Sequence, residues 1–558
     1  MQRSLDLDDI QGNVTRAYGR YAFPFSRSFF LNIQDPGKGR QFVDAVRKKV
    51  TTGATWTEAT KPRCTVNIGF TFFGLYKLLV PQRTLRDMPE EFISGMRDRA
   101  FLLGDRDPGK TEAEARGWDA HWDPIWQQNR IGDGDIGNDN VHIWVSFNAQ
   151  LKELGKAEPV DELEQESQWL RDLCDHLAGG VRIIPHNGRA GDQEYQEGSV
   201  LFVQRGDKLI PTPNEHFGFT DAIGDPVFRG QLSDAEAKDA VIGTGKWMNA
   251  RTGWQPIEPG EFVLGHPDES QELPPIARPW EFMANGTFMA YRKLHQNVAS
   301  FEAVVAEEAR TYAKLQAIDE PEARETLRAK MCGRWSDGVP LAQAPTYAEW
   351  QAMSEKLGFN VADPVQALWN KLNYIRSPEA SNFRYADDML GYKTPLGAHI
   401  RRMNTRDYMD PLNQTGIDPA TGCQFANPNA THGLNKRRRI LRRGLPYGPP
   451  PGAEKTDETE QGVAMISMCA SLQRQFEFVQ QQWIQYGLDF HQGNDTCPML
   501  GNHHQHKRFS IQSDPASGKP PFIMSKLRTF VECRGGDYFF VPSLTSLRMM
   551  AMGIIDPT

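Results

Sequence analysis

Three segments of the chain carry side chains that could act in acid–base or metal chemistry. They contain Asp221 in EHFGFTDA, His399 in GAHIRRMN and Arg442 in ILRRGLPYG. A carboxylate can shuttle a proton, a neutral imidazole can bind a metal, and a guanidinium can stabilise negative charge at any working pH. Taken singly, each motif has an ordinary structural explanation: a helix cap, a buried structural histidine and a surface charge.

The elements that position these residues alternate between strands and helices in the first half of the chain. Residues 66–72 are rich in β-formers and lead into a helix that starts near residue 74. Residues 142–147 predict a second strand. A helical region with a break at Pro159 is then expected over 148–178, followed by a strand at 181–184.

The last hundred residues repeat this order. Residues 463–468 predict a strand followed by a helix over 470–483, and residues 538–542 predict a strand that leads into a helix. The segment VSFNAQL at 145–151 aligns with ISMCASL at 466–472, with three identical positions in seven. This similarity indicates two related α+β halves. Between them, residues 298–330 and 345–375 are rich in helix formers, and 407–433 and 448–461 predict long loops.

Composition excludes several classes of protein. The 558 residues include 63 Lys and Arg against 71 Asp and Glu, for a net charge of −8, which is unfavourable for nucleic-acid binding. No apolar run is long enough for a transmembrane helix, and acidic residues stand where a secretory signal would be apolar. The seven cysteines are scattered, so we expect free thiols and a cytoplasmic protein.

Four other motifs predict no function. The sequence GTGK at 243–246 lacks the remainder of a phosphate-binding loop, and 133–144 lacks the glutamate of a calcium loop. The sequence HHQH at 503–506 has no partners at zinc-ligand spacing. The basic run at 436–443 is interpreted as a solvated face or a surface anion site.

Together and in this order, the three reactive segments resemble the dye-decolourising peroxidase family. The resemblance also includes DIQGN at 9–13, GEFVLG at 260–265 and RGGDYFFVP at 534–542, so it extends over most of the chain. It implies an α+β fold of two duplicated ferredoxin-like domains with antiparallel sheets, placed at residues 1–226 and 227–558. The expected insertions lie near 298–375 and 407–433.

The resemblance further implies a haem b peroxidase. His399 would bind the iron, and Asp221 and Arg442 would act on the opposite side, where hydrogen peroxide arrives. Arg406 would contact a haem propionate. The partners would be hydrogen peroxide and a bulky aromatic or dye-like reductant oxidised by one-electron steps, with no nucleic acid and no membrane. Homo-oligomers are common in the family. Val463 and Met465 would line the pocket at positions where the family often has Leu and Phe.

Two departures from the family pattern bear on the site. Ala222 replaces the second glycine of Gly-x-x-Asp-Gly; if that position needs a positive φ, alanine would strain the turn and could misplace Asp221. The carboxylate partner of His399 is also not evident, because Asp495 is a candidate but Cys497 stands where an acid is expected. The alternatives are a haem-handling or haem-sensing protein with little turnover, and an α+β interaction protein without haem.

Overall fold

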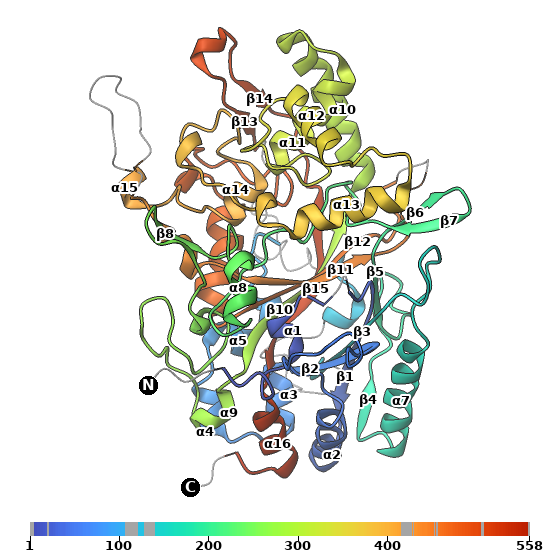
Figure 1. Ribbon diagram of the computed structural model, residues 1–558. Helices are drawn as coiled ribbons and strands as arrows, with labels where there is room; N and C mark the ends of the chain where they lie inside the picture. Colours follow the sequence, from blue (N-terminus) through green and yellow to red (C-terminus); the bar gives the residue numbers. More distant parts are fainter. Residues whose placement is uncertain are drawn as a thin grey trace.

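An antiparallel sheet of nine strands forms the centre of the computed structural model (Figure 1). The structure describes residues 5–18, 22–105, 121–127, 140–414, 427, 429–450, 452, 456–503 and 507–555. Along the sheet the strands follow the order β11-β12-β10-β15-β2-β3-β1-β4, and β5 also pairs with β1. Strands from the first and second parts of the chain therefore occupy different halves of one sheet.

The first half has ferredoxin-like topology, because its strands and helices alternate and its sheet order is β4-β1-β3-β2. Helix α2 follows β1 along the chain, and helix α7 follows β3. The elements are β1 (Phe25–Ile33), α2 (Pro36–Arg47), β2 (Cys64–Phe70), β3 (Ile143–Ala149), α7 (Glu162–His176), β4 (Val181–Ile183) and β5 (Gln196–Ser199).

The second half repeats the same order, with β15-β10-β12-β11 in place of β4-β1-β3-β2. A π-helical segment over Leu472–Glu477 and Val479–Ile484 takes the place of α7. The two halves meet where β15 pairs with β2 at Phe540 and Phe70. The strands are β10 (Thr287–Gln296), β11 (Leu441–Tyr447), β12 (Gly462–Cys469) and β15 (Val531–Val541). The duplication predicted from the repeated segments is confirmed.

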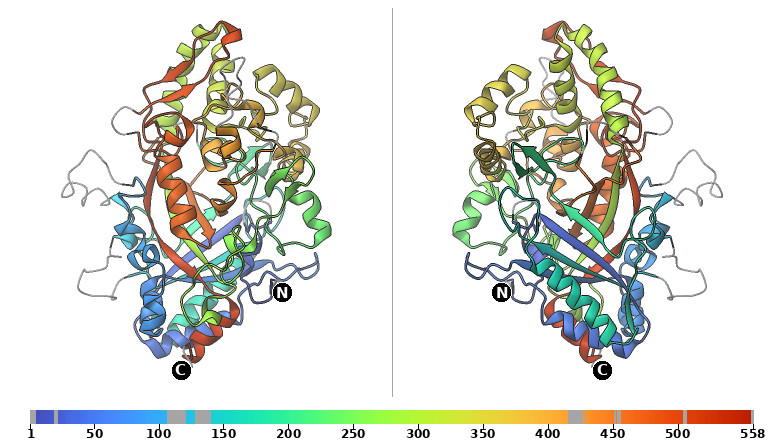
Figure 2. Two further views of the ribbon diagram at one scale, coloured as in Figure 1. Left: turned by 90° about the vertical axis from the view of Figure 1, so that its left-hand side faces the viewer. Right: turned by 90° about the vertical axis from the view of Figure 1, so that its right-hand side faces the viewer.

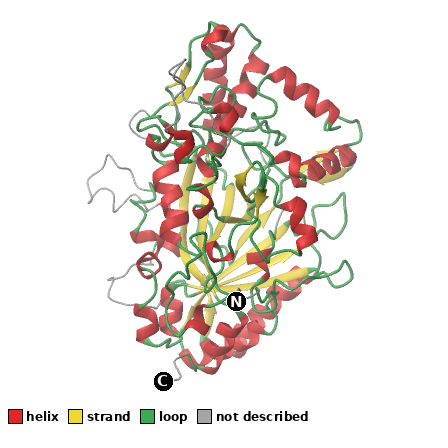
Figure 3. Cartoon of the chain, turned by 60° about the vertical axis from the view of Figure 1, so that its left-hand side comes forward, coloured by secondary structure: helices red, strands yellow, loops and turns green. Residues whose placement is uncertain are grey.

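Both faces of the sheet are buried, which explains the almost continuous apolar runs in its strands. In β3, Val145 and Phe147 pack into one core while Trp144 packs into the other. In β15, Phe540 and Phe539 divide in the same way. Helices α2 and α7 lie at one end of the molecule with α16 (Leu544–Met552) (Figures 1 and 3).

A helical insertion between β10 and β11 lies at the opposite end of the molecule (Figure 2). The two helix-rich predictions are confirmed, and side chains fix where two of these helices start. Asp319 accepts a hydrogen bond from the backbone of Glu322, and Asp363 does so from Val365. The insertion contains α10 (Val298–Gln316), α11 (Glu320–Cys332), α12 (Tyr347–Lys356) and α13 (Pro364–Arg376).

Shorter elements connect these layers. The short helices are α1 (Gly12–Thr15), α3 (Phe72–Lys77), α4 (Gln82–Arg86), α5 (Glu90–Asp98), α8 (Asp234–Ala240), α9 (Trp280–Met283), α14 (His399–Met403) and α15 (Pro411–Gln414). The small hairpins are β6 (Phe202–Arg205) with β7 (Lys208–Pro211), β8 (Lys246–Asn249) with β9 (Gly253–Gln255), and β13 (Phe509–Ile511) with β14 (Phe522–Met524).

The helix predicted from residue 148 is wrong in its first part. Strand β3 continues to Ala149, because Asn148 and Ala149 pair with β1 on one side and β2 on the other. Gly155 has a positive φ of 104°, and the helix begins only at Glu162. Of the two predicted loops, 407–433 includes α15, while residues 415–426, 428, 451 and 453–455 lie outside the described residues.

Candidate active site

A cavity of about 320 Å³ lies against one face of the second half-sheet. Strand β12 lines it with Val463, Met465 and Ser467, and the neighbouring strand β11 lines it with Arg442 and Gly444. Arg442 lies opposite Ser467, and Gly444 lies opposite Met465. Because side chains alternate between the faces of a strand, these residues lie on the same face of the strand pair, and Arg443 adds to the lining from β11.

His399 lines another part of the cavity, at the first residue of α14. Its Nδ1 lies 3.4 Å from Sγ of Cys497, and its Nε2 has no hydrogen-bond partner among the described residues. Burial, reinforced by the charge of Arg442, lowers the pKa of His399 to about 4. The imidazole is therefore neutral near pH 7, which is the form that binds a metal ion.

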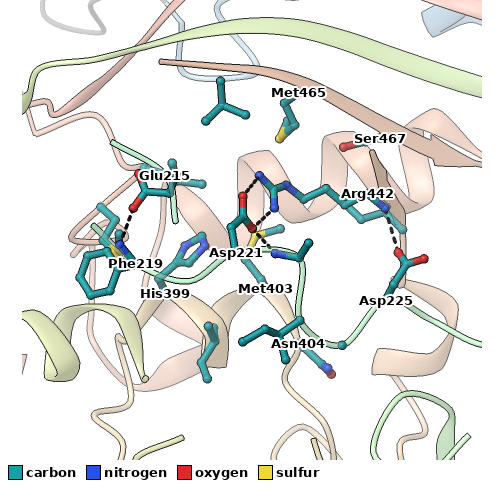
Figure 4. A pocket seen from close by; sticks show the side chains of 18 of the residues that line it. Glu215, Phe219, Asp221, Asp225, His399, Met403, Asn404, Arg442, Met465 and Ser467 are labelled. Carbon is teal, nitrogen blue, oxygen red and sulfur yellow. Dashed lines mark hydrogen bonds and ion pairs between the residues drawn. The ribbon is translucent and has the colours of Figure 1, made fainter. Parts of the chain in front are cut away.

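Asp221 and Arg442 form an ion pair at the cavity wall (Figure 4). Nη2 of Arg442 donates to Oδ2 of Asp221 over 2.6 Å, and Nη1 donates to Oδ1. Burial disfavours the charged guanidinium, but the charge of Asp221 outweighs it and raises the pKa of Arg442. The pair therefore presents a carboxylate and a permanent positive charge side by side to one cavity.

The turn that carries Asp221 is strained at the next residue. Ala222 has a φ of 63°, in the left-handed region that favours glycine, which confirms the expectation drawn from the missing glycine. The strain does not separate Asp221 from Arg442, since the two side chains are in direct contact. The backbone N–H of Ala222 also donates to Oδ1 of Asp221 over 2.6 Å, so the strained turn helps to orient the carboxylate.

We expect Ala222→Gly to stabilise the protein. The left-handed conformation costs a non-glycine residue about 1–2 kcal/mol, and glycine loses about 0.5–1 kcal/mol more on folding than alanine. The free energy of unfolding should therefore rise by about 0.5–1 kcal/mol, measured by urea denaturation without cofactor. Ala178→Gly is the matched control, because Ala178 is exposed, has a φ of 51° and lies outside the cavity lining. A destabilised Ala222→Gly protein beside a stabilised control would contradict this explanation.

Three buried arginines give the cavity an excess of positive charge. Arg334, Arg406 and Arg439 all line it, and among the described residues none forms an ion pair with a carboxylate. Their guanidinium groups donate instead to backbone carbonyls, for example from Arg406 to Phe383 over 2.7 Å and from Arg439 to Gly224 over 2.9 Å. Burial lowers the pKa of Arg406 to about 9 and that of Arg439 to about 10.

The interpretation of the basic run at 436–443 as a solvated face is wrong for several of its arginines. Arg439 and Arg443 are buried, and Arg443 pairs with Asp225 over 2.8 Å. Arg437 pairs with Asp268 over 2.9 Å. Basic side chains of this segment therefore form ion pairs with acidic residues elsewhere in the chain, and Arg439 lines the cavity.

A planar apolar group with carboxylates and a metal fits the chemistry of this cavity. Apolar side chains such as Phe383, Met403 and Leu500 form much of the wall, which would accept an aromatic macrocycle. The unpaired arginines would neutralise its carboxylates, and His399 would bind its metal. Two buried hydroxyls on the wall, those of Tyr385 and Ser467, also have no hydrogen-bond partner within the described part of the chain. These hydroxyls would be able to form hydrogen bonds with polar groups of a molecule bound in the cavity.

The structure brings all the predicted site residues to this one cavity. They are Asp221, Arg442, His399, Arg406, Val463 and Met465. Three further charged residues line the cavity, Arg334, Arg439 and Glu215, to which no sequence motif gave a role. Glu215 accepts hydrogen bonds from the backbone of Phe217 and Phe219 and from Gln296, and burial raises the pKa of its carboxyl group.

The four dismissed motifs do not form further sites in the described residues. Lys246 is buried in ion pairs with Glu258 and Glu269, and β8 starts there. His503 binds Thr496 and the carbonyl of Cys497, whereas residues 504–506 and 128–139 lie outside the described residues. Within the described ranges no cluster of potential metal ligands occurs, and no helix has the length and apolar character of a membrane span.

Comparison with known proteins gives full-length relatives, although no protein-family model matches the chain. Peroxidase 2 of Mycetinis scorodonius is 26% identical over 563 residues, which cover 98% of this chain and 87% of that protein. Multifunctional dye peroxidase DyP2 of an Amycolatopsis species is 23% identical over 576 residues, covering 98% of this chain and 96% of that protein.

The fold is also that of solved dye-decolourising peroxidases. The structure of one such enzyme in complex with 2,6-dimethoxyphenol superposes with a TM-score of 0.67 and 20% sequence identity. The match covers 98% of this chain and 100% of the other. The α+β fold of two duplicated ferredoxin-like units, expected from the sequence, is confirmed over almost the whole chain.

Proposed function

We propose that this chain, which is similar over its full length to dye-decolourising (DyP-type) peroxidases, is a member of that family and reduces hydrogen peroxide with electrons from aromatic, dye-like reductants. One observation carries the proposal: the Asp221–Arg442 pair and the neutral imidazole of His399 share one cavity.

The cofactor in this proposal is haem b. His399 would bind its iron through Nε2, and Arg406 and Arg439 would neutralise its propionates. Val463, Met465 and the other apolar side chains of the wall would contact the macrocycle. When bound, the haem would supply an iron centre that can give two electrons to peroxide and take them back, one at a time, from a reductant.

Asp221 and Arg442 supply the proton transfer and the charge stabilisation. Cleavage of the O–O bond requires a proton to leave one peroxide oxygen and to arrive on the other. Asp221 would accept that proton and then release it to the departing oxygen. Arg442 would hold the carboxylate in position before the transfer and would stabilise the negative charge that develops on the departing oxygen. The guanidinium keeps its charge throughout, because its pKa is raised.

The reductant is proposed to be a phenol or a dye. A relative of known structure binds 2,6-dimethoxyphenol, which is therefore the first substrate to test. Haem-loaded protein should oxidise this phenol, followed by absorbance, only when hydrogen peroxide is present. Neither haem-free protein nor haem-loaded protein without peroxide should produce the colour. Equal rates from free haem and from the loaded protein would contradict a peroxidase function.

We expect Arg439→Met to weaken haem binding. Hydrogen bonds to charged groups contribute about 1.5–3 kcal/mol, so losing one propionate partner should reduce affinity roughly 10- to 100-fold in a haem titration. The apo-protein should become more stable, because a buried charge without an ion pair is removed. Arg438→Met is the matched control: Arg438 is the preceding residue but does not line the cavity, and it should leave haem affinity unchanged. Equal affinities for both variants would contradict the role of Arg439.

Several finer statements are also part of the proposal. A cytoplasmic location agrees with six free cysteines among the described residues. Membership of a large bacterial group agrees with the long insertions, although most relatives found are fungal and one is from Amycolatopsis. A domain boundary between residues 226 and 227 agrees with the division of strands between the half-sheets. Self-association is proposed from the family alone.

A further inference from the structure

The ring of His399 is held by a thiol. Its Nδ1 lies 3.4 Å from Sγ of Cys497, and no carboxylate of the described residues bonds to this ring. Asp495, the acid considered from the sequence, is bound elsewhere, since it accepts a hydrogen bond from the backbone of Arg508. The carbonyl of Asp495 accepts from Arg402 over 3.2 Å. Asp495 as the partner of His399 is therefore a prediction that the structure does not support.

The sulfur of Cys497 is fixed by its surroundings. Its side chain is fully buried, and its backbone N–H donates to Ile484 over 2.7 Å. Its carbonyl accepts hydrogen bonds from Gly501 over 2.9 Å and from His503 over 3.0 Å. The backbone N–H of Leu500 donates to Sγ over 3.5 Å, so the sulfur already acts as an acceptor. The backbone of Cys497 is thus anchored on both sides, and a rotation of Sγ away from His399 would also break its bond from Leu500.

We propose that Cys497 is a positioning residue whose sulfur accepts the Nδ1–H of His399 and directs the Nε2 lone pair into the cavity. The inference rests on the proposed haem site. In metal sites the partner of a ligating histidine fixes the tautomer and tunes the basicity of the ring. Sulfur is a weak acceptor, whereas a carboxylate is a strong one. The imidazole of this chain is therefore a weaker electron donor to iron than an imidazole held by an acid, and the ferric state is stabilised less.

The first test uses the protein without haem. Protein labelled with ¹⁵N at histidine only would be compared with Cys497→Ala by two-bond ¹H–¹⁵N correlation NMR, with His399→Gln assigning the signal. In the wild type, the proton of His399 is expected on Nδ1. In Cys497→Ala, loss of the acceptor should shift the signal towards a mixture of tautomers. A wild-type proton on Nε2, or identical tautomers in both proteins, would overturn the proposal.

The second test measures the ferric/ferrous reduction potential of the haem-loaded protein by spectroelectrochemistry. Cys497→Ala should raise the potential, Cys497→Ser should lower it modestly, and Cys497→Asp should lower it most, because the acceptor strength rises in that order. Cys469→Ala is the control, since Cys469 is equally buried but, unlike Cys497, does not contact His399. Its potential should equal that of the wild type.

Equal potentials for Cys497→Ala, Cys497→Ser and the control would overturn the proposal, even if Cys497→Asp does not fold. Neither test involves peroxide turnover. A protein with the expected tautomer and potentials but without peroxidase activity would reject the proposed function and keep this inference. An active peroxidase whose reduction potential is unchanged by substitutions at residue 497 would support the proposed function and reject this inference.

Discussion

Replacing Asp221 by Asn is expected to lower kcat/KM for hydrogen peroxide by about 10²–10⁴-fold, because a positioned acid–base group contributes that much to a proton transfer. Arg442→Leu should lower it by about 10²–10³-fold, the loss typical of one charge-stabilising donor. Both variants should still bind haem, since His399, Arg406 and Arg439 are unchanged. The rates would be measured by stopped-flow mixing of haem-loaded proteins with peroxide.

The double variant Asp221→Asn with Arg442→Leu tests whether these two side chains act as one unit or contribute independently to the rate. Asp221 and Arg442 are held together by two hydrogen bonds, so removing both should cost little more than removing Asp221 alone. Asp225→Asn is the matched control, because Asp225 also lines the cavity and accepts the backbone N–H of Arg442 over 3.2 Å, but pairs with Arg443. A control that loses as much rate as Asp221→Asn would show that general negative charge, and not the position of Asp221, matters.

His399→Gly is expected to remove the iron ligand and to abolish or strongly shift the Soret band of the haem-loaded protein. The ring is the one imidazole on the cavity wall in the described part of the chain, and its loss leaves space next to Cys497. Added imidazole should enter that space and restore the spectrum, which would assign the effect to the missing ligand. His295→Gln is the control, since His295 is buried and bonds to Asp457 outside the cavity lining. An unchanged Soret band in His399→Gly would refute the assignment.

The sequence predicted those features that depend on local pattern. Apolar strands followed by helices, and the similarity of VSFNAQL to ISMCASL, pointed to two related α+β halves, and the family resemblance added the ferredoxin-like domains. The helix expected at 148 failed because Asn148 and Ala149 are held by pairing with strands far away in the chain. Strand pairing of this kind overrides local helix preference and cannot be seen in a window of neighbouring residues.

The site was predicted only as far as the family motifs extend. His399, Asp221 and Arg442 come from three distant segments, and only the resemblance connected them before the fold did. Arg439 was missed because its burial depends on contacts with Thr244 and Gly224 across the cavity. The partner of His399 needed the structure as well, because only the fold decides whether Asp495 or Cys497 reaches the ring.

The most direct test of the account is the absorption spectrum of the haem-supplemented wild-type protein before and after rapid mixing with hydrogen peroxide. We predict a Soret band on haem binding and a spectral change at stoichiometric peroxide that is complete within the first seconds. Addition of 2,6-dimethoxyphenol should then return the original spectrum. A protein that binds haem but whose spectrum does not respond to peroxide would contradict the peroxidase proposal and favour a role in haem handling.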